Sequence, residues 1–123
     1  MQRMVHQLAV EKGWYTPVKS DGECIAMMHS ELSEALEEVR KGYQHGLEIY
    51  QDTSGPGSTG IQTPRSKAWD PKLKPEGVLI ELADCVIRIM DTCEHKGWDL
   101  NKAILLKHAY NKTRSYRHGG KLL

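Results

Sequence analysis

Residues 78–97 read VLIELADCVIRIMDTCEHKG, and this stretch decides the fold. Its apolar side chains recur at three- and four-residue steps and cover about 220° of a helical wheel. A surface helix of a small monomer needs a narrower apolar stripe than this. We therefore expect a central helix that opens after Pro75, ends at Gly97 and is buried both by its own chain and by a second subunit.

The same periodicity predicts three further helices. The first runs from about Arg3 to Lys12, and the second begins near Asp21 or Gly22 and continues to Lys41. The last begins after Asp99, a plausible N-cap, and continues to about Ser115 or Tyr116. Glycines that follow the first three helices are typical stop signals.

Residues 42–74 differ from the rest because glycine and proline are frequent there, as in Ser54-Gly55-Pro56-Gly57. This pattern predicts a long irregular loop between the second and third helices, and a sheet content near zero. The whole chain, residues 1–123, then forms one all-α domain. We expect a four-helix, bundle-like arrangement that is completed by oligomerisation, because four helices of this size enclose only a small core.

Composition excludes several classes of protein. The chain has 123 residues, of which 39% are hydrophobic and 27% charged, as in one globular domain. No apolar run approaches the ~20 residues that span a bilayer, so no membrane helix is expected. The first residues lack the apolar core of a secretory signal. Three cysteines without Cys-x-x-Cys spacing fit neither a disulfide framework nor a zinc knuckle, so we expect a cytoplasmic protein.

The charges are unevenly distributed along the chain. All 16 acidic residues lie within residues 1–99 with 11 Lys and Arg, which gives −5, whereas residues 100–123 hold six Lys and Arg and no acid, which gives +6. Such a chain could hold cations at one place and a polyanion at another. A solvated helix end, whose cations complement the helix dipole, is the alternative.

Two acidic pairs, Glu31 with Glu34 and Glu81 with Asp84, fall in the second and third predicted helices. An i,i+3 step places both carboxylates of a pair on one side of a helix. If the two helices pack side by side, four carboxylates meet in an arrangement that suits Mg²⁺. The alternative is that the pairs simply belong to the solvated faces of the helices.

A stripe on the last helix changes from apolar to cationic along its length. It begins with Leu100 and Ile104, which are typical of a core, and continues at steps of four, three and four with Lys107, Asn111, Arg114 and His118. Lys and Arg there could bind phosphate oxygens, with Arg117 and Lys121 continuing as a flexible basic end. A frayed helix end that faces water remains the alternative.

These segments resemble the MazG-like, all-α nucleoside triphosphate pyrophosphohydrolases. The resemblance covers about residues 21–40 and 75–121. It is carried by Glu31-x-x-Glu34, by Glu81-x-x-Asp84 with the preceding KPEG at 74–77, by KHAYNKTR at 107–114 and by YRHGGK at 116–121. The insertion at 42–74 departs from the family, whose two acidic motifs are usually closer together.

The resemblance implies hydrolysis of a nucleoside or deoxynucleoside triphosphate to the monophosphate and pyrophosphate, in nucleotide-pool house-cleaning. It implies Mg²⁺, with Mn²⁺ as a substitute. The small core by itself predicts a homodimer or homotetramer. The implied metal ligands are Glu31, Glu34, Glu81 and Asp84, and Glu34 would also orient the attacking water. The implied contacts to phosphates or sugar are Lys107, Asn111, Arg114, Arg117 and Lys121.

Other readings of the sequence lead to different functions. A carboxylate-bridged di-iron bundle is excluded because no glutamate is followed by histidine three residues later. A non-catalytic helical module could bind nucleic acid or nucleotides through the basic C-terminal segment, but the acidic pairs would then have no purpose. Four aromatic residues could stack on a base or serve only in packing: Trp14, Tyr15, Trp69 and Tyr110.

Overall fold

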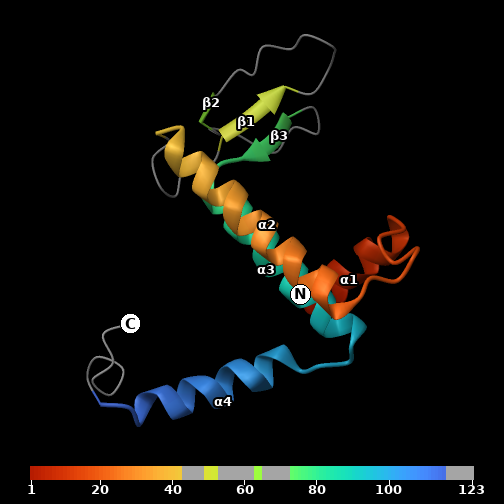
Figure 1. The fold of residues 1–123 in the computed structure, drawn as a ribbon, viewed down its shortest axis with the longest axis vertical. Coiled ribbons are helices and arrows are strands. Elements are labelled where there is room, and N and C mark those ends of the chain that lie inside the picture. Colours follow the sequence, from red (N-terminus) through yellow and green to blue (C-terminus); the bar gives the residue numbers. More distant parts are fainter. Residues whose placement is uncertain (43–48, 53–62, 65–72, 116–123) are drawn as a thin grey trace.

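The computed structural model describes residues 1–42, 49–52, 63–64 and 73–115 (Figure 1). The described part is mostly helical, with four helices and short strands, so the all-α prediction is confirmed at this level. The elements, in chain order, are α1 (Gln2–Glu11), α2 (Asp21–Arg40), β1 (Ile49–Asp52), β2 (Thr63–Pro64), β3 (Leu73–Glu76), α3 (Val78–His95) and α4 (Leu100–Lys112). Each helix lies where the periodicity predicts it. No described helix is long and apolar enough to cross a membrane.

α3 is the central helix, as predicted, because α1 and α2 both pack against it. α2 runs antiparallel to α3 along most of its length (Figure 1). The buried residues at these contacts are few: the apolar Ala9, Ala35, Val78 and Cys85, and the acidic Glu31, Glu38, Glu81 and Asp91. Half of this small core is therefore carboxylate, which is an unusual and costly composition unless the charges find partners.

The start of α2 is fixed by a capping box. The side chain of Ser20 accepts a hydrogen bond from the backbone N–H of Glu23 at 3.3 Å, and the Glu23 carboxylate accepts one from the backbone N–H of Ser20 at 2.7 Å. Both bonds satisfy donors that the first turn of a helix leaves free. The cap sets where α2 begins and hence which residues of α2 face α3.

Polar contacts fix α1 on the C-terminal half of α3. His6 Nδ1 lies 2.7 Å from Asp91 Oδ1, and the amide of Gln2 donates to the Glu94 carboxylate at 2.8 Å. Tyr15, just beyond α1, stacks on the ring of His95 with the centroids 4.2 Å apart. These contacts place the α1–α2 connection, and Trp14 within it, beside α3.

Three short strands lie within or beside the segment predicted as an irregular loop. They form an antiparallel sheet in the order β2-β1-β3, with Ile49 opposite both Pro64 and Glu76. The prediction for 42–74 is corrected for these residues, and the rest of that segment lies outside the described residues. Pro64, one of the prolines behind the loop prediction, lies in the edge strand β2, a position where sheets tolerate proline.

α4 does not complete a bundle within the chain. Figure 1 shows it leaving the lower end of α3 and running away from the α2–α3 pair, and it packs extensively on no other described element. The expectation that its leading residues enter a core is wrong for the single chain, since Leu100 is only half-buried and Ile104 is 56% exposed. The four-helix arrangement is thus a three-helix unit, α1–α2–α3, with a separate fourth helix.

Candidate metal centre

Three carboxylates from two helices converge at the upper half of the α2–α3 pair. Glu31 and Glu34 lie one turn apart on α2, and Glu81 lies in the first turn of α3. One carboxylate oxygen from each of the three lies within 4.8 Å of the other two. Glu31 and Glu81 are buried, at 6% and 8% exposure, whereas Glu34 is exposed. We call this group the carboxylate cluster; its oxygens are ligands that a hard divalent cation prefers.

A sharp corner between β3 and α3 places Glu81 in this cluster. Gly77 separates the strand from the helix and has a φ of +106°, which is accessible to glycine and strained for other residues. Its carbonyl accepts the first helical hydrogen bonds, from the backbone N–H groups of Ile80 and Glu81 at 2.9 and 3.1 Å. The carboxylate of Glu81 therefore sits at the positive end of the α3 dipole, where a negative charge is favoured.

Asp84 lies beside the cluster, one turn further along α3. It is half-buried and lines a cavity of about 110 Å³ together with Glu31, Arg88, Trp14 and Ile87. Asp84 is not among the three residues whose oxygens converge, but its charge acts on them. The structure therefore brings all four predicted metal ligands to one place, three in direct convergence and the fourth at the adjoining cavity.

The pKa values of the cluster show the cost of this crowding. Burial raises the pKa of Glu81, and the negative charges of Glu34 and Asp84 raise it further. Burial also raises the pKa of Asp84, with a contribution from Glu31 that Arg88 opposes. A raised carboxyl pKa means that the ionised form is disfavoured, so a cation bound here would relieve the repulsion.

Two cations of the chain already lie against the cluster. Arg88 donates from Nε to Glu31 Oε1 and from Nη1 to the sulfur of Met27 at 3.8 Å. Lys74, on β3, donates to Glu76 at 2.9 Å, and its positive charge acts on Glu81 and Glu34. Four acids therefore face two internal cations, which leaves a smaller negative excess for a metal to offset.

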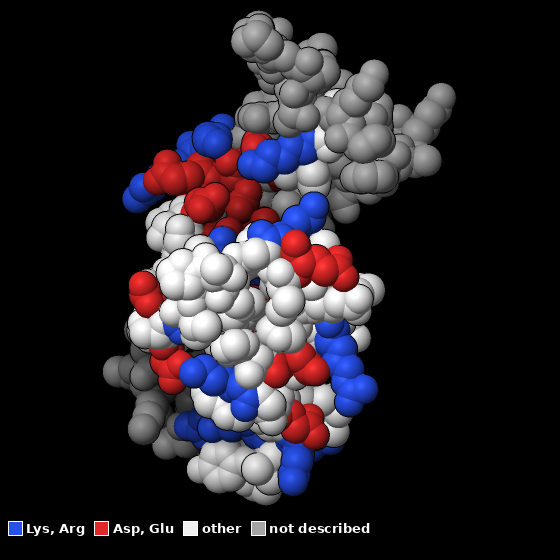
Figure 2. Space-filling view, turned by 90° about the vertical axis from the view of Figure 1, so that its right-hand side faces the viewer, with Lys and Arg blue, Asp and Glu red and all other residues white. Residues whose placement is uncertain are grey.

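Arg88 and Lys74 were not assigned to the site from sequence. The signal for Arg88 is its spacing, since it lies four residues after Asp84 and seven after Glu81 on α3 and so shares their face. Lys74 carries no comparable signal, because its position depends on the pairing of β3 with β1. Figure 2 shows a patch of Asp and Glu side chains with Lys and Arg at its edge in the upper part of the view, and further acidic side chains scattered below it.

The aromatic candidates separate clearly in the structure. Trp14 lines the 110 Å³ cavity beside Glu31 and Asp84, whereas Tyr15 packs between the rings of His6 and His95. Tyr110 lies on α4 with the ammonium of Lys107 5.1 Å from its ring centroid. Trp69 lies outside the described residues. Trp14 is thus the aromatic side chain that the structure places at the carboxylates.

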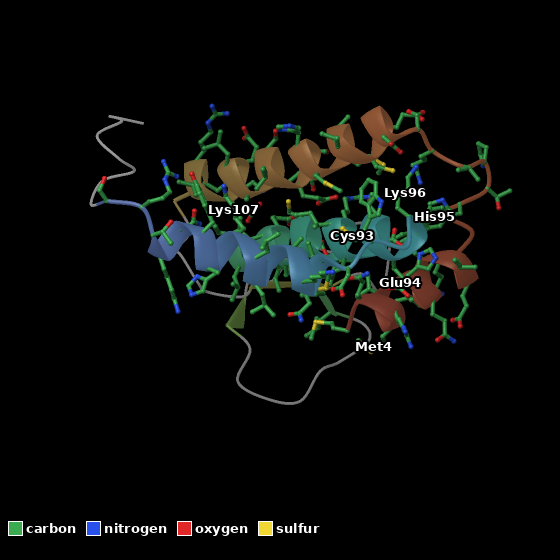
Figure 3. All side chains as sticks on the ribbon, turned by 90° about the horizontal axis from the view of Figure 1, so that it is seen from below. Met4, Cys93, Glu94, His95, Lys96 and Lys107 are labelled. Atoms are coloured by element: carbon green, nitrogen blue, oxygen red, sulfur yellow. The ribbon has the colours of Figure 1, made fainter. Side chains whose placement is uncertain are left out.

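The predicted phosphate contacts are not near the carboxylate cluster of their own chain. Lys107 and Asn111 are exposed on α4, and Arg114 lies just beyond its last residue. Figure 3 shows Lys107 on α4, which runs away from the cluster-bearing half of the α2–α3 pair in Figure 1. Arg117, His118 and Lys121 lie outside the described residues. A single chain therefore assembles the acidic half of the predicted site and leaves the cationic half on a separate helix.

Comparisons with known proteins identify no relative: no protein-family model, no curated protein and no solved structure matches this chain. The function is therefore inferred from the geometry of the cluster. That geometry offers buried, partly neutralised carboxylates, an exposed carboxylate at the rim and a cavity with an aromatic wall. Chemically, such a site can hold a divalent cation and place a water molecule or an anionic ligand next to it.

Proposed function

We propose that this protein hydrolyses nucleoside or deoxynucleoside triphosphates to the monophosphate and pyrophosphate, with Mg²⁺ as its cofactor. The observation that supports the proposal is the convergence of Glu31, Glu34 and Glu81 from two helices, with Asp84 at the adjoining cavity. The proposal assigns the chain to the MazG-like pyrophosphohydrolases, which its two acidic motifs resemble, and to nucleotide-pool house-cleaning.

The donor set fits Mg²⁺, because it consists of carboxylate oxygens alone and leaves room for water and phosphate ligands. Glu31, Glu34, Glu81 and Asp84 would hold the ion, and Mn²⁺ would substitute for it. When bound, Mg²⁺ neutralises polyphosphate charge and lowers the pKa of a coordinated water. The negative excess of the cluster is then offset by the cation that the substrate also needs.

The individual residues take different parts in this proposal. Glu34 is the exposed member of the cluster, so it is the carboxylate that can orient a water for attack on the α-phosphorus. Arg88 donates a hydrogen bond to the buried Glu31 and so fixes the direction of its carboxylate. The phosphate and sugar contacts are assigned to Lys107, Asn111, Arg114, Arg117 and Lys121, which would stabilise the charge that develops on pyrophosphate.

Oligomerisation belongs to the same proposal, as a homodimer or homotetramer. Large apolar side chains remain exposed on every described helix, which a small monomer rarely tolerates. Examples on the α2–α3 pair are Ile25, Leu32, Leu36, Leu79, Leu82 and Val86. A second copy that covers such surfaces would supply the core that four helices of one chain cannot enclose.

The test is a screen of common and oxidised triphosphates with separate readouts for pyrophosphate and orthophosphate. We expect Mg²⁺-dependent release of pyrophosphate, loss of turnover in Glu34→Gln and normal turnover in Glu37→Gln. Glu37 is a matched control because it is an exposed glutamate on the same helix whose carboxylate pairs with Arg40 at 2.5 Å, outside the cluster. Orthophosphate as the first product, or equal rates in the two variants, would contradict the proposal.

A second candidate function is a non-catalytic module that binds nucleic acid or nucleotides. It is favoured by one observation, that α4 is exposed and carries Lys102, Lys107 and Lys112 with no acidic residue. Salt dependence separates the two functions, since affinity for nucleic acid falls steeply as ionic strength rises. Tight duplex or single-strand binding at low salt, with no turnover of any triphosphate, would favour the second candidate.

A further inference from the structure

α4 has the properties of a helix that is covered in the assembled protein. Ile104 is 56% exposed and Leu106 72% exposed, and Leu105 and Tyr110 are also largely exposed. These four side chains point to more than one side of the helix, so α4 lacks the single polar face of a solvated surface helix. Apolar groups on several sides are typical of a helix packed between other elements.

The corner between α3 and α4 directs α4 away from its own chain. Gly97 has a φ of +68°, and the backbone N–H of Trp98 donates to the carbonyl of Cys93 at 2.8 Å. The amide of Gln2, on α1, donates to the carbonyl of Trp98 at 3.0 Å, and the Asp99 side chain caps the first turn of α4 at 2.9 Å. The turn at Gly97 and the hydrogen bond between Gln2 and Trp98 hold this corner in place.

That α1–α3 surface contains an apolar groove of about 510 Å³. Its apolar lining comes from Met4, Val5, Leu8 and Ala9 of α1, from Trp14 and from Ile87 of α3. Met4 is visible on α1 in Figure 3. Trp14 and Ile87 also line the 110 Å³ cavity that holds Glu31 and Asp84. The groove therefore adjoins the cavity of the candidate metal centre, with Trp14 and Ile87 lining both.

α4 carries the complementary order on one stripe. Leu100 and Ile104 are followed by Lys107 and Asn111 on the same side of the helix, and Ile104 and Lys107 are separated by a rise of about 4.5 Å. A helix with apolar groups followed by cations complements an apolar groove that adjoins an acidic cavity. The charge balance agrees, since residues 1–99 sum to −5 and residues 100–123 to +6. Because both surfaces belong to the same chain, the occupant that fits the groove is a second copy.

We infer that two copies of this chain exchange their α4 helices, so that α4 of each copy lies in the apolar groove of the other and brings Lys107 and Asn111 to the other copy's carboxylate cluster. The exchange is isologous, since each copy gives and receives the same helix. It explains how a chain whose α4 lysines lie away from its own carboxylate cluster can form a complete site. The packing of α4 in the groove is inferred from the groove and the helix alone. Only the role of Lys107 and Asn111 rests on the proposed function.

The first experiment measures mass by sedimentation equilibrium and does not involve activity. The wild-type protein is expected to sediment as at least twice the 13.9 kDa chain, and Ile104→Asp is expected to reduce that mass at least twofold. Asn101→Asp is the matched control, because it adds the same charge to an exposed position of α4 outside the stripe. A monomeric wild type, or an Ile104→Asp variant with unchanged mass, would overturn the inference.

The second experiment asks whose groove α4 occupies. Chains with Leu8→Cys and chains with Ile104→Cys, carrying tags of different length, are mixed and oxidised. A disulfide-linked band that contains one chain of each kind, and that is missing when either variant is oxidised alone, is the expected result. A double variant that instead forms an internal disulfide and remains a monomer would show that α4 folds back on its own chain, and would overturn the inference.

The third experiment separates this inference from the proposed function. Glu34→Gln and Lys107→Ala chains, each impaired alone, are unfolded together and refolded at equal concentration. Exchanged helices give mixed dimers one intact site, so about a quarter of wild-type turnover should return. If cations act within their own chain, nothing returns, and the inference fails while the proposed function stands. If the wild type itself has no activity, the proposed function fails and the mass and cross-linking results still decide the exchange.

Discussion

The α1–α2–α3 unit and α4 differ in how far they pack against the rest of their own chain. In the unit, α3 is flanked by two helices, and the buried Glu31 and Asp91 are hydrogen-bonded to Arg88 and His6. In α4, exposed apolar groups alternate with lysines, and extensive packing with the other described elements is absent. The chain thus brings the predicted acidic ligands together and carries the described part of the predicted cationic contacts on or just beyond a separate helix. Substitutions in each region test this difference between the α1–α2–α3 unit and α4.

The largest expected effect is on turnover when the acidic half is damaged. Asp84→Asn keeps the size of the side chain and removes a negative charge from the cavity beside Glu31. We expect pyrophosphate release to fall about 100-fold or more, because a metal ligand or its immediate neighbour is lost. Helix content, measured by circular dichroism, should be unchanged. A rate within a few-fold of wild type would remove Asp84 from the site.

A stability effect should appear when the internal counter-cation is removed. Arg88→Met leaves the buried carboxylate of Glu31 without its partner, and we expect the free energy of unfolding in urea to fall by about 2 kcal/mol. Adding Glu31→Gln should recover part of the loss. The control is Lys96→Met, which breaks the ion pair with the exposed Asp21 at the opposite end of the same helices and should cost about 0.5 kcal/mol or less.

The pH dependence of stability should change sign with metal. In EDTA, the raised pKa values of Glu81 and Asp84 mean that the folded protein holds these protons more tightly than the unfolded chain. Stability contributed by this region is therefore present at low pH and is lost as pH rises from the ordinary carboxyl pKa through the raised values. Glu81→Gln should remove the loss and stabilise the metal-free protein at neutral pH by about 1 kcal/mol or less, since solvent screens the repulsion.

Added Mg²⁺ should reverse the pH dependence of stability. It should stabilise the wild-type protein at neutral pH, where the carboxylates are ionised, and have little effect near pH 4. Thermal unfolding with and without Mg²⁺ at the two pH values measures both trends. Stabilisation by Mg²⁺ that is equal at both pH values, or that persists in Glu81→Gln, would contradict the assignment of the cluster.

The smallest effect compares the caps of the two regions. Ser20→Ala removes the capping box of α2, and we expect the unfolding free energy to fall by about 1 kcal/mol. Asp99→Ala removes the cap of α4. At concentrations low enough to dissociate the oligomer, it should cost only a few tenths of a kcal/mol, because fraying of α4 is not coupled to the α1–α2–α3 unit. Equal losses at low concentration would show that α4 packs within its own chain.

Local patterns in the sequence predicted the helices and the grouping of the acids. A spacing of three residues puts Glu31 beside Glu34 on one side of α2. Apolar periodicity makes α3 the central helix, so packing of α2 on α3 brings Glu81 to these two acids. Gly13, Gly42 and Gly97 end their helices with φ values of +75°, +80° and +68°, as their positions predicted. Such features depend on interactions between residues close in sequence.

The features that sequence reasoning missed depend on long-range geometry. The partnership of Arg88 with Glu31 joins residues 57 positions apart, and Lys74 reaches the cluster only through strand pairing. The β strands have two to four residues each, too few to show an alternating pattern. The stripe on α4 was recognised, but a stripe specifies only a face of a helix. The surface against which that face would pack depends on the corner at Gly97 and, under the proposed exchange, on a second copy of the chain.

The central claim is that side chains from α2 and α3 hold one divalent cation between them, and Mn²⁺ binding followed by electron paramagnetic resonance tests it most directly. We expect one Mn²⁺ per chain, competed by Mg²⁺, with binding weakened alike in Glu31→Gln and Glu81→Gln and kept in Glu37→Gln. Binding that survives Glu81→Gln, or that is lost equally in Glu37→Gln, would show that the two helices do not share an ion and would contradict the account.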